Sequence, residues 1–211
     1  MTRLTALALL LGGLLFAAST PVAAQQAQAT QQAVFAAGCF WCIEADFEKV
    51  DGVIEAVSGY AGGHTKNPTY RQVVGGNTGH KEVVRVTYDP AKVSYAQLLK
   101  VFWVNVDPYD ARGQFCDKGE SYKAAIFPVG AQQTALAKQS LALVETQILK
   151  RDVATTIEPA ATFYKAETYH QNYYKTNSTK YKYYRWRCGR DARLQAVWGK
   201  ADLTPLNQLT R

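Results

Sequence analysis

Residues 33–47 read AVFAAGCFWCIEADF, and their hydrophobic period changes at the glycine. The five residues before Gly38 form a continuous apolar run, which is typical of a short buried strand. From Phe40 to Phe47 the apolar residues recur at steps of three and four, which predicts an amphipathic helix. A strand, a glycine turn and a helix in this order place Cys39 at the start of the helix.

Further along the chain, strand-like and helix-like patterns alternate. Period-two patterns predict strands over Val53 to Tyr60 and over Lys81 to Tyr88. Ser94 and Gln97 have the spacing of a capping box that opens a helix, and residues 131–150 carry the apolar period of a longer helix. Strands that alternate with helices predict an α/β fold, a compact two-layer sandwich with a central mixed sheet flanked by helices.

Both ends of the chain are expected to lie outside the main domain. Residues 1–24 have the pattern of a secretory signal, because Arg3 precedes an apolar run shorter than the ~20 residues of a membrane-spanning helix. We therefore expect an exported protein, periplasmic or secreted, with no membrane insertion after cleavage. The other expected boundaries are a flexible leader at 25–32, one catalytic domain at 33–174, and an irregular tail at 175–211 that packs on the domain and carries Cys188.

The formal net charge is +7, and removal of residues 1–24 lowers it by one, because Arg3 is the only charged residue there. The mature chain is therefore basic, and many of its cations lie between Lys175 and Arg193 among tyrosine and tryptophan residues. A basic, aromatic segment also occurs in nucleic-acid-binding proteins, but no groove-reading motif accompanies this one. We expect a solvated basic face and no nucleic-acid partner.

The four cysteines permit several interpretations. In an oxidising compartment, an even number is compatible with two structural disulfides. The Cys39-x-x-Cys42 spacing also occurs in zinc sites and in thioredoxin-like redox sites. No metal is expected, because Cys116 and Cys188 stand alone and no two histidines are neighbours in sequence. The position of Cys39 favours a reactive thiol, since a helix N-terminus stabilises a thiolate.

A series of short motifs resembles the peptide methionine sulfoxide reductase A family. The resemblance runs in order from about residue 34 to residue 174, which is most of the mature chain. The motifs are GCFWCIE at 38–44, NPTY at 67–70, GHKE at 79–82, FCD at 115–117, SY at 121–122 and YHQ at 169–171.

The resemblance implies a role for each site residue. Cys39 would be the nucleophile, and Phe40 and Trp41 would form the wall of the pocket for the methionine methyl group. Glu82 would be the acid that protonates the sulfoxide oxygen, a poor leaving group until it is protonated. The residues that would hold that oxygen are Tyr70, Asp117 and Tyr122. Glu44, one turn into the helix, is interpreted as structural.

After oxygen transfer, Cys39 would be left as a sulfenic acid that condenses with a second thiol. Cys188 is the first candidate for this resolving cysteine, because the resemblance favours a C-terminal one. Cys42 is the second candidate and Cys116 the third. The resemblance implies methionine-(S)-sulfoxide as substrate, in oxidised proteins and as the free amino acid, with a thioredoxin-like dithiol as reductant and no bound cofactor. A monomer is expected.

Two other classes of function remain open on the sequence. A periplasmic thioredoxin-like disulfide oxidoreductase would use Cys39 and Cys42 against protein dithiols. A non-enzymatic module would use its cysteines as two stable disulfides and its basic tail to bind acidic partners.

Overall fold

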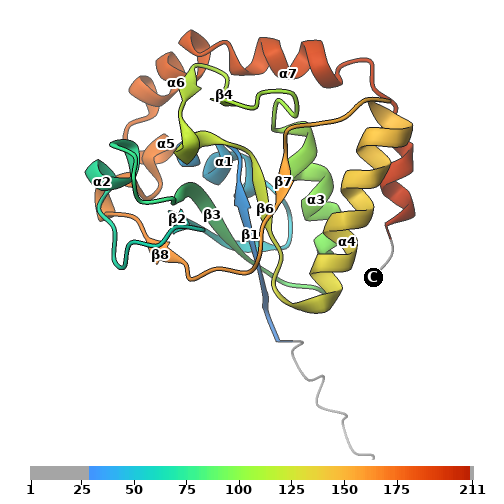
Figure 1. Cartoon of the computed structure of the whole chain (residues 1–211), viewed down its shortest axis with the longest axis horizontal. Helices are drawn as coiled ribbons and strands as arrows, with labels where there is room; N and C mark the ends of the chain where they lie inside the picture. Colours follow the sequence, from blue (N-terminus) through green and yellow to red (C-terminus); the bar gives the residue numbers. More distant parts are fainter. Residues whose placement is uncertain (1–28, 210–211) are drawn as a thin grey trace, which may run out of the picture.

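The computed structural model describes residues 29–209, so the expected signal peptide and residues 25–28 of the expected leader lie outside the described part. At its centre is a six-stranded sheet with the order β7-β6-β1-β3-β2-β8 (Figure 1). Neighbouring strands are antiparallel except β6 and β7, which are parallel. The strands are β1 (Gln31–Ala36), β2 (Val53–Ala61), β3 (Lys81–Tyr88), β6 (Ala125–Phe127), β7 (Thr156–Ile157) and β8 (Tyr164–Lys165).

Helices flank this sheet, which confirms the predicted α/β class with a central mixed sheet. A buried aromatic stack joins the first strand to two helices, because the ring of Phe35 lies 4.9 Å from that of Phe47 and 5.4 Å from that of Phe102. The indole N–H of Trp103, which follows Phe102 in the same helix, donates to Ser140 across 3.0 Å and ties that helix to a third one. The helices of the main domain are α1 (Phe40–Phe47), α2 (Tyr70–Val74), α3 (Tyr95–Val104) and α4 (Gly130–Leu143).

The local signals in the sequence are present in the structure. Ser94 and Gln97 form the predicted capping box at the start of α3. The helix predicted over 131–150 is α4, which continues as a π-helical turn over Val144–Ile148. A second capping box, between Thr69 and Gln72, starts the short helix α2, which the sequence analysis did not predict.

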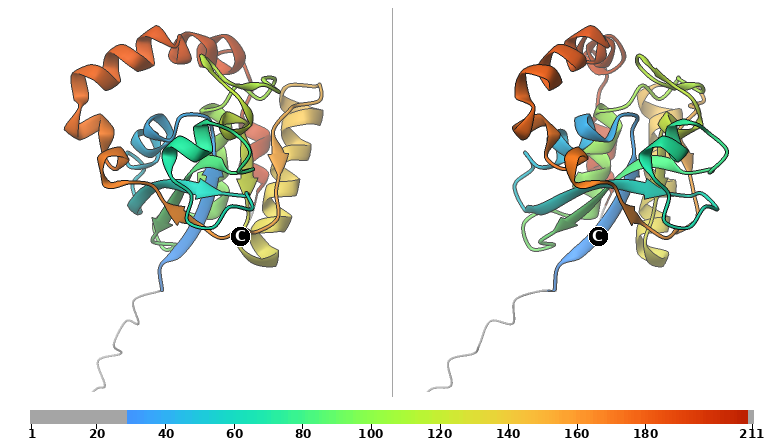
Figure 2. Two further views of the ribbon diagram at one scale, coloured as in Figure 1. Left: turned by 60° about the vertical axis from the view of Figure 1, so that its left-hand side comes forward. Right: turned by 90° about the vertical axis from the view of Figure 1, so that its left-hand side faces the viewer.

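The C-terminal tail differs from the prediction, because it is largely helical and not irregular. It forms α5 (Tyr173–Thr176), α6 (Ser178–Arg187) and α7 (Arg190–Trp198). These helices arch over the end of the domain at which β1 ends and α1 begins (Figures 1 and 2). No described helix is long and apolar enough to cross a membrane.

The tail helices are held on the domain by ion pairs and polar contacts, which explains why the hydrophobic pattern of the sequence did not predict them. Arg185 pairs with Asp46 of α1 across 3.0 Å, and Arg193 pairs with Asp107 across 2.7 Å. The indole of Trp198 donates to the carbonyl of Val106 across 2.8 Å. Helices that are polar on all sides and held by such pairs show no apolar stripe in the sequence.

Candidate active site

Cys39 is the N-cap residue of α1, at the end of β1, where the sequence predicts it. Gly38 makes the turn with φ of +81°, a conformation that favours glycine. A Cβ atom at this position would also lie 2.5 Å from Cβ of Gln114. The turn therefore requires glycine for two reasons, and it holds the Cys39 side chain in a buried position, 6% exposed.

Glu82 lies beside this turn, on the second residue of β3. Its Oε2 accepts a hydrogen bond from the backbone N–H of Phe40 across 3.0 Å. The side chain is buried, and burial raises the pKa of Glu82 to about 8. At neutral pH the carboxyl group is therefore largely protonated and can donate a proton to a bound ligand.

A small cavity of about 190 Å³ opens next to the Cys39 thiol. It brings together, from the start of α1, from α2, from β3 and from the region of β5, all seven of the residues expected for catalysis and substrate binding. Its lining residues are Cys39, Phe40, Trp41, Tyr70, Glu82, Asp117, Tyr122 and Tyr184.

Trp41, which forms part of the apolar wall of the cavity, is held in place by residues that do not line the cavity. The ring of Trp41 stacks on Tyr173 with centroids 3.8 Å apart, and its indole N–H donates to Nδ1 of His170 across 3.1 Å. Burial lowers the pKa of His170, so the imidazole stays neutral and keeps an unprotonated nitrogen as acceptor. Trp41 is therefore fixed before any ligand enters.

Tyr70 and Tyr122 both supply neutral hydroxyl groups to the lining of the cavity. Burial raises the pKa of Tyr70 to about 12 and also raises that of Tyr122, so both remain protonated at neutral pH. Glu167 positions Tyr70, because its carboxylate accepts from the Tyr70 backbone N–H and from the Tyr60 hydroxyl, each across 2.8 Å. The two hydroxyls can hold a polar oxygen atom without carrying charge.

Asp117 begins the short strand β5 (Asp117–Lys118), which pairs with β4 (Gly113–Gln114). Its Oδ2 accepts a hydrogen bond from the hydroxyl of Tyr184. Burial raises the pKa of this carboxyl group, although the Tyr184 hydrogen bond acts in the opposite direction.

Cys42 lies one helical turn after Cys39, is buried, and is a free thiol like its neighbour. The two thiols belong to one buried cluster with Ala45 and Tyr181. Burial raises the pKa of Cys39 well above its usual range. The interaction with Cys39 lowers the pKa of Cys42. Of the two buried thiols, Cys39 therefore holds its proton more tightly than Cys42.

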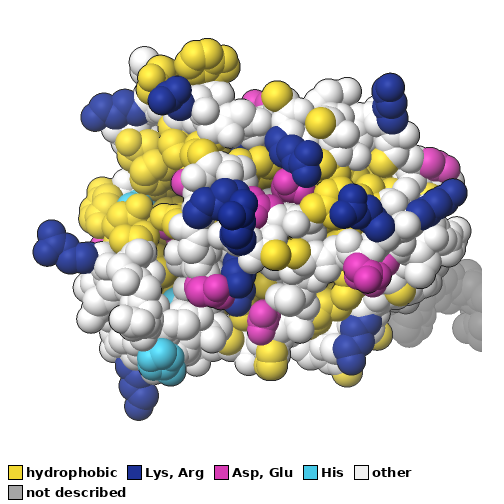
Figure 3. All heavy atoms as spheres, turned by 45° about the horizontal axis from the view of Figure 1, so that its top comes forward, with side chains coloured by type: hydrophobic (Ala, Val, Ile, Leu, Met, Phe, Trp, Pro, Cys, Tyr) yellow, Lys and Arg dark blue, Asp and Glu magenta, His cyan; other side chains and the backbone are white. Residues whose placement is uncertain are grey.

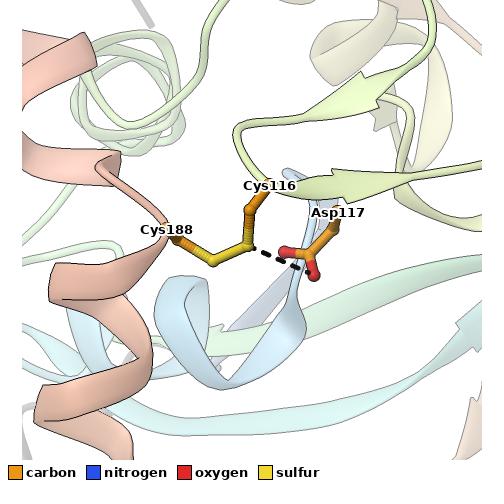
Figure 4. Close-up of side chains that lie close together, drawn as sticks. All are labelled: Cys116, Asp117 and Cys188. Carbon is orange, nitrogen blue, oxygen red and sulfur yellow. Dashed lines mark hydrogen bonds between the residues drawn. A yellow bond between two sulfur atoms is a disulfide. The ribbon is translucent and has the colours of Figure 1, made fainter.

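Cys188, the first candidate for the resolving cysteine, is not a free thiol in the structure. It forms a disulfide with Cys116, and the two Cα atoms are 4.9 Å apart (Figure 4). Together with Asp117, the two sulfurs make a group whose ligand atoms lie within 4.8 Å of one another. Because the sulfurs are bonded to each other, they are not available as thiolate ligands for a metal ion.

Comparisons with known proteins agree with this geometry. A family model described as peptide methionine sulfoxide reductase matches residues 31–202. The chain belongs to the peptide methionine sulfoxide reductase A family. It is 50% identical over 190 residues to peptide methionine sulfoxide reductase MsrA 2 of Caulobacter vibrioides, an alignment that covers 88% of this chain and 96% of the relative. It is 45% identical over 175 residues to MsrA of Bacillus licheniformis, covering 82% and 97% of the two chains.

Solved structures give the same result. Methionine sulfoxide reductase A of Corynebacterium diphtheriae matches with a TM-score of 0.66 and 32% identity, over 74% of this chain and 77% of that one. Reduced Mxr1 of Saccharomyces cerevisiae matches with a TM-score of 0.66 and 27% identity, over 71% and 86%. The protein is thus a methionine sulfoxide reductase, an oxidoreductase of the peptide-methionine (S)-S-oxide reductase class. This family takes electrons from thioredoxin-type reductants and not from a bound cofactor.

Two residues of this reductase site were missed by sequence reasoning. Tyr184 lies among five tyrosines in a basic segment, where no pattern separates it from the others. Its spacing of four residues before Cys188, one helical turn, was the available signal. His170 belongs to a motif quoted for the family resemblance, but its contact with Trp41 spans 129 residues of sequence.

Proposed function

We propose that this reductase converts methionine-(S)-sulfoxide, in proteins and as the free amino acid, to methionine with Cys39 as nucleophile. One observation carries the proposal. A buried carboxyl group that is still protonated at neutral pH, Glu82, lines a 190 Å³ cavity together with the Cys39 thiol. A nucleophile and an acid are the two groups needed to take oxygen from a sulfoxide.

The proposed first step transfers the oxygen. Cys39 attacks the sulfoxide sulfur while Glu82 protonates the oxygen, and Tyr70 and Tyr122 hold that oxygen by hydrogen bonds. The S–O bond of the substrate breaks, methionine leaves, and the oxygen remains on Cys39 as sulfenic acid. The methyl group of the substrate lies against Phe40 and Trp41.

The shared cluster of the two buried thiols supports Cys42 as the residue that next attacks the sulfenic acid, which releases water and forms a Cys39–Cys42 disulfide. Cys42 thus replaces Cys188 as the first candidate for the resolving cysteine. Cys188 keeps a redox role in the proposal, as half of a second pair. Cys116 is exposed, whereas Cys39 and Cys42 are buried, so a protein dithiol can reach only the second pair directly.

The reduced Cys116 and Cys188 thiols would then exchange with the Cys39–Cys42 disulfide and become a disulfide themselves. A thioredoxin-like dithiol would reduce that bond. This exchange would leave the inner pair reduced and the outer pair oxidised, and the observed Cys116–Cys188 disulfide beside free Cys39 and Cys42 supports it.

The alternative of a thioredoxin-like disulfide oxidoreductase is less well supported. Disulfide exchange needs no general acid and no pair of hydroxyl groups around an oxygen site. The alternative of a module with two stable disulfides does not fit a structure in which Cys39 and Cys42 are free and buried beside a cavity.

A coupled assay with thioredoxin, thioredoxin reductase and NADPH tests the proposal. We expect turnover of the S epimer of a blocked methionine sulfoxide, of an oxidised protein and of free methionine sulfoxide, and no turnover of the R epimer. Cys39→Ser should abolish each activity while the fold is kept, because serine lacks a thiolate at neutral pH. Insulin reduction without sulfoxide reduction, or residual turnover of Cys39→Ser within tenfold of wild type, would refute it.

We further propose that the protein is exported and works as a monomer outside the cytoplasm, without binding nucleic acid or inserting in the membrane. The apolar run and small residues before Gln25 support export. Mass spectrometry of the mature N-terminus after cell fractionation tests this, with Gln25 expected as the first residue and a periplasmic or secreted location. Sedimentation tests the oligomeric state.

A further inference from the structure

Tyr184 of α6 lines the same cavity as the reacting thiol. Its ring meets the ring of Trp41 edge-on, at 5.8 Å between centroids and an interplanar angle of 78°. It also packs against the cluster formed by Cys39, Cys42 and Tyr181. The side chain is therefore held on two sides, although it comes from a helix far along the chain.

The hydroxyl of Tyr184 lies near two groups that both take part in proton transfer. It donates to Oδ2 of Asp117, and its residue lines the same cavity as Cys39 and packs against the cluster that contains the Cys39 thiol. A phenol carries one hydrogen and two lone pairs, so it can donate to one of these groups and accept from the other. Tyr184 can thus close a continuous chain of Cys39, Tyr184 and Asp117.

The proposed reaction needs such a chain. Glu82 must give up its proton to the sulfoxide oxygen, so it cannot at the same moment receive the proton of Cys39. A second group has to take that proton when the thiolate forms.

We propose that Tyr184 is a catalytic residue that passes the Cys39 proton to Asp117 and then donates its hydrogen bond to the thiolate. The S–H bond of Cys39 breaks and its proton moves to the Tyr184 oxygen, while the original phenol proton moves to the Asp117 carboxylate. Tyr184 ends neutral, Cys39 is a thiolate, and Asp117 is a carboxylic acid. The assignment rests on the proposed nucleophile and deepens that function.

The charges around the chain are compatible with this transfer. Burial raises the pKa of Asp117, which makes it a better proton acceptor than an exposed aspartate. Burial also raises the pKa of Tyr184, so the phenol remains a neutral donor. The titratable and charged groups that face the three residues from neighbouring elements are Cys42, Tyr70, Glu82, Tyr122, Lys118, Arg185 and Arg190.

A disulfide links the two chain segments that carry Tyr184 and Asp117. Cys188 follows Tyr184 by one turn at the end of α6, and Cys116 immediately precedes Asp117. The disulfide between them joins the two segments that carry the donor and the acceptor (Figure 4). While this disulfide is formed, it holds the phenol in the cavity of the reacting thiol without relying on the substrate.

Tyr184→Phe removes the hydroxyl and keeps the ring against Trp41, and Tyr183→Phe is the matched control, on an exposed ring outside the cavity. Two quantities are measured from pH 6 to pH 9.5: the burst rate of methionine release, and the rate of Cys39 alkylation by iodoacetamide, identified by peptide mass spectrometry. In Tyr184→Phe we expect both rates to fall about tenfold at pH 7 and the rising limb of each profile, which reports the Cys39 thiolate, to move up by about one pH unit, with little change in KM. Tyr183→Phe should match wild type.

Asp117→Asn provides a second variant in case Tyr184→Phe does not fold. It retains an acceptor for the phenol but cannot take a proton, so the alkylation profile should move in the same direction. Unchanged profiles in either folded variant would overturn the proposal. Equal slowing at every pH with a raised KM would also overturn it, since that result indicates a packing role only. Alkylation reports the Cys39 thiolate even if sulfoxide is not the substrate, so this failure is separable from failure of the proposed function.

Discussion

The backbone N–H of Phe40 donates to Oε2 of Glu82 across 3.0 Å, so the residue that follows the proposed nucleophile holds the proposed acid. The first free N–H group of α1 is thereby used to orient a carboxyl group and not to stabilise the Cys39 thiolate. A hydrogen bond to the ionised form favours ionisation, yet burial dominates and keeps the pKa of Glu82 at about 8. The site is arranged so that acid and nucleophile are fixed by the same turn.

Glu82→Gln should lower the burst rate of methionine release by ~10²-fold or more, the usual cost of losing a positioned general acid. Substrate binding should change little, because glutamine retains the shape of the side chain. In wild type, the burst should decline as pH rises through about 8, since the acid loses its proton there. The glutamine variant should lack this decline.

The control for this experiment is Glu120→Gln, whose carboxyl side chain is 77% exposed and pairs with Lys123. It should behave like wild type at each pH. An unchanged burst in Glu82→Gln would assign the proton to water or to a tyrosine.

Trp41→Ala should raise KM by roughly 10- to 100-fold and reduce the saturated rate much less, because it removes apolar surface that contacts the methyl group in ground state and transition state alike. Steady-state kinetics with a small sulfoxide substrate measure both constants. Trp186→Ala is the matched control, since that ring is 73% exposed. A fall in the saturated rate alone would show that Trp41 acts on the chemical step.

Local sequence patterns predicted those parts of the fold and of the site that depend only on residues close together in the sequence. The apolar run before Gly38 and the three-to-four spacing after it were sufficient for strand, turn and helix, and so for the position of Cys39. The burial of Glu82 followed only from family resemblance, because a strand residue of period two can face either side of a sheet until its partners are known.

Contacts between distant segments were not accessible from sequence. Tyr184 reaches Asp117 over 67 residues, and it does so from a helix without an apolar stripe. The pairing of Cys116 with Cys188 likewise spans 72 residues, and four cysteines permit three pairings. Spacing alone therefore could not show that Cys188 has a partner other than Cys39.

The two cysteine pairs predict a stoichiometry. Each sulfoxide consumes two thiols, so fully reduced enzyme, freed of dithiothreitol, should release two methionines per chain if both pairs take part. Cys116→Ser and Cys188→Ser should each release one, with an unchanged rate for that first methionine. Turnover with thioredoxin should collapse in both variants.

Counting methionine by chromatography and mapping disulfides by mass spectrometry distinguishes the roles. Release of one methionine from the wild type, with a Cys116–Cys188 bond that dithiothreitol does not reduce, would make that bond a structural link and leave Cys42 as the terminal thiol. Cys42→Ser should leave a sulfenic acid on Cys39 that dimedone labels more strongly than in wild type. Equal labelling would remove Cys42 from the resolving step.

The last prediction concerns Glu44, which is fully buried in α1. Its Oε2 accepts from the Ser58 hydroxyl across 3.0 Å and its Oε1 from the backbone N–H of Asn172 across 2.9 Å, so it joins α1, β2 and the start of the tail. This agrees with its interpretation as a structural residue. Burial raises its pKa to about 7 from the ordinary value of 4.5.

This shift has a definite sign in the pH dependence of stability. Between pH 4.5 and 7 the folded chain retains a proton on Glu44 that the unfolded chain has lost, so the free energy of unfolding falls as pH rises through this range and levels off above it. Glu44→Gln can keep both contacts, with its amide donating to Ser58, and it cannot ionise. Denaturant unfolding at several pH values should therefore show the stability of the variant relative to wild type increasing from pH 5 to pH 8. Glu82 contributes a similar slope to both proteins, and the difference between them isolates Glu44. A difference that stays constant with pH would show that Glu44 is already ionised in the folded protein at pH 5.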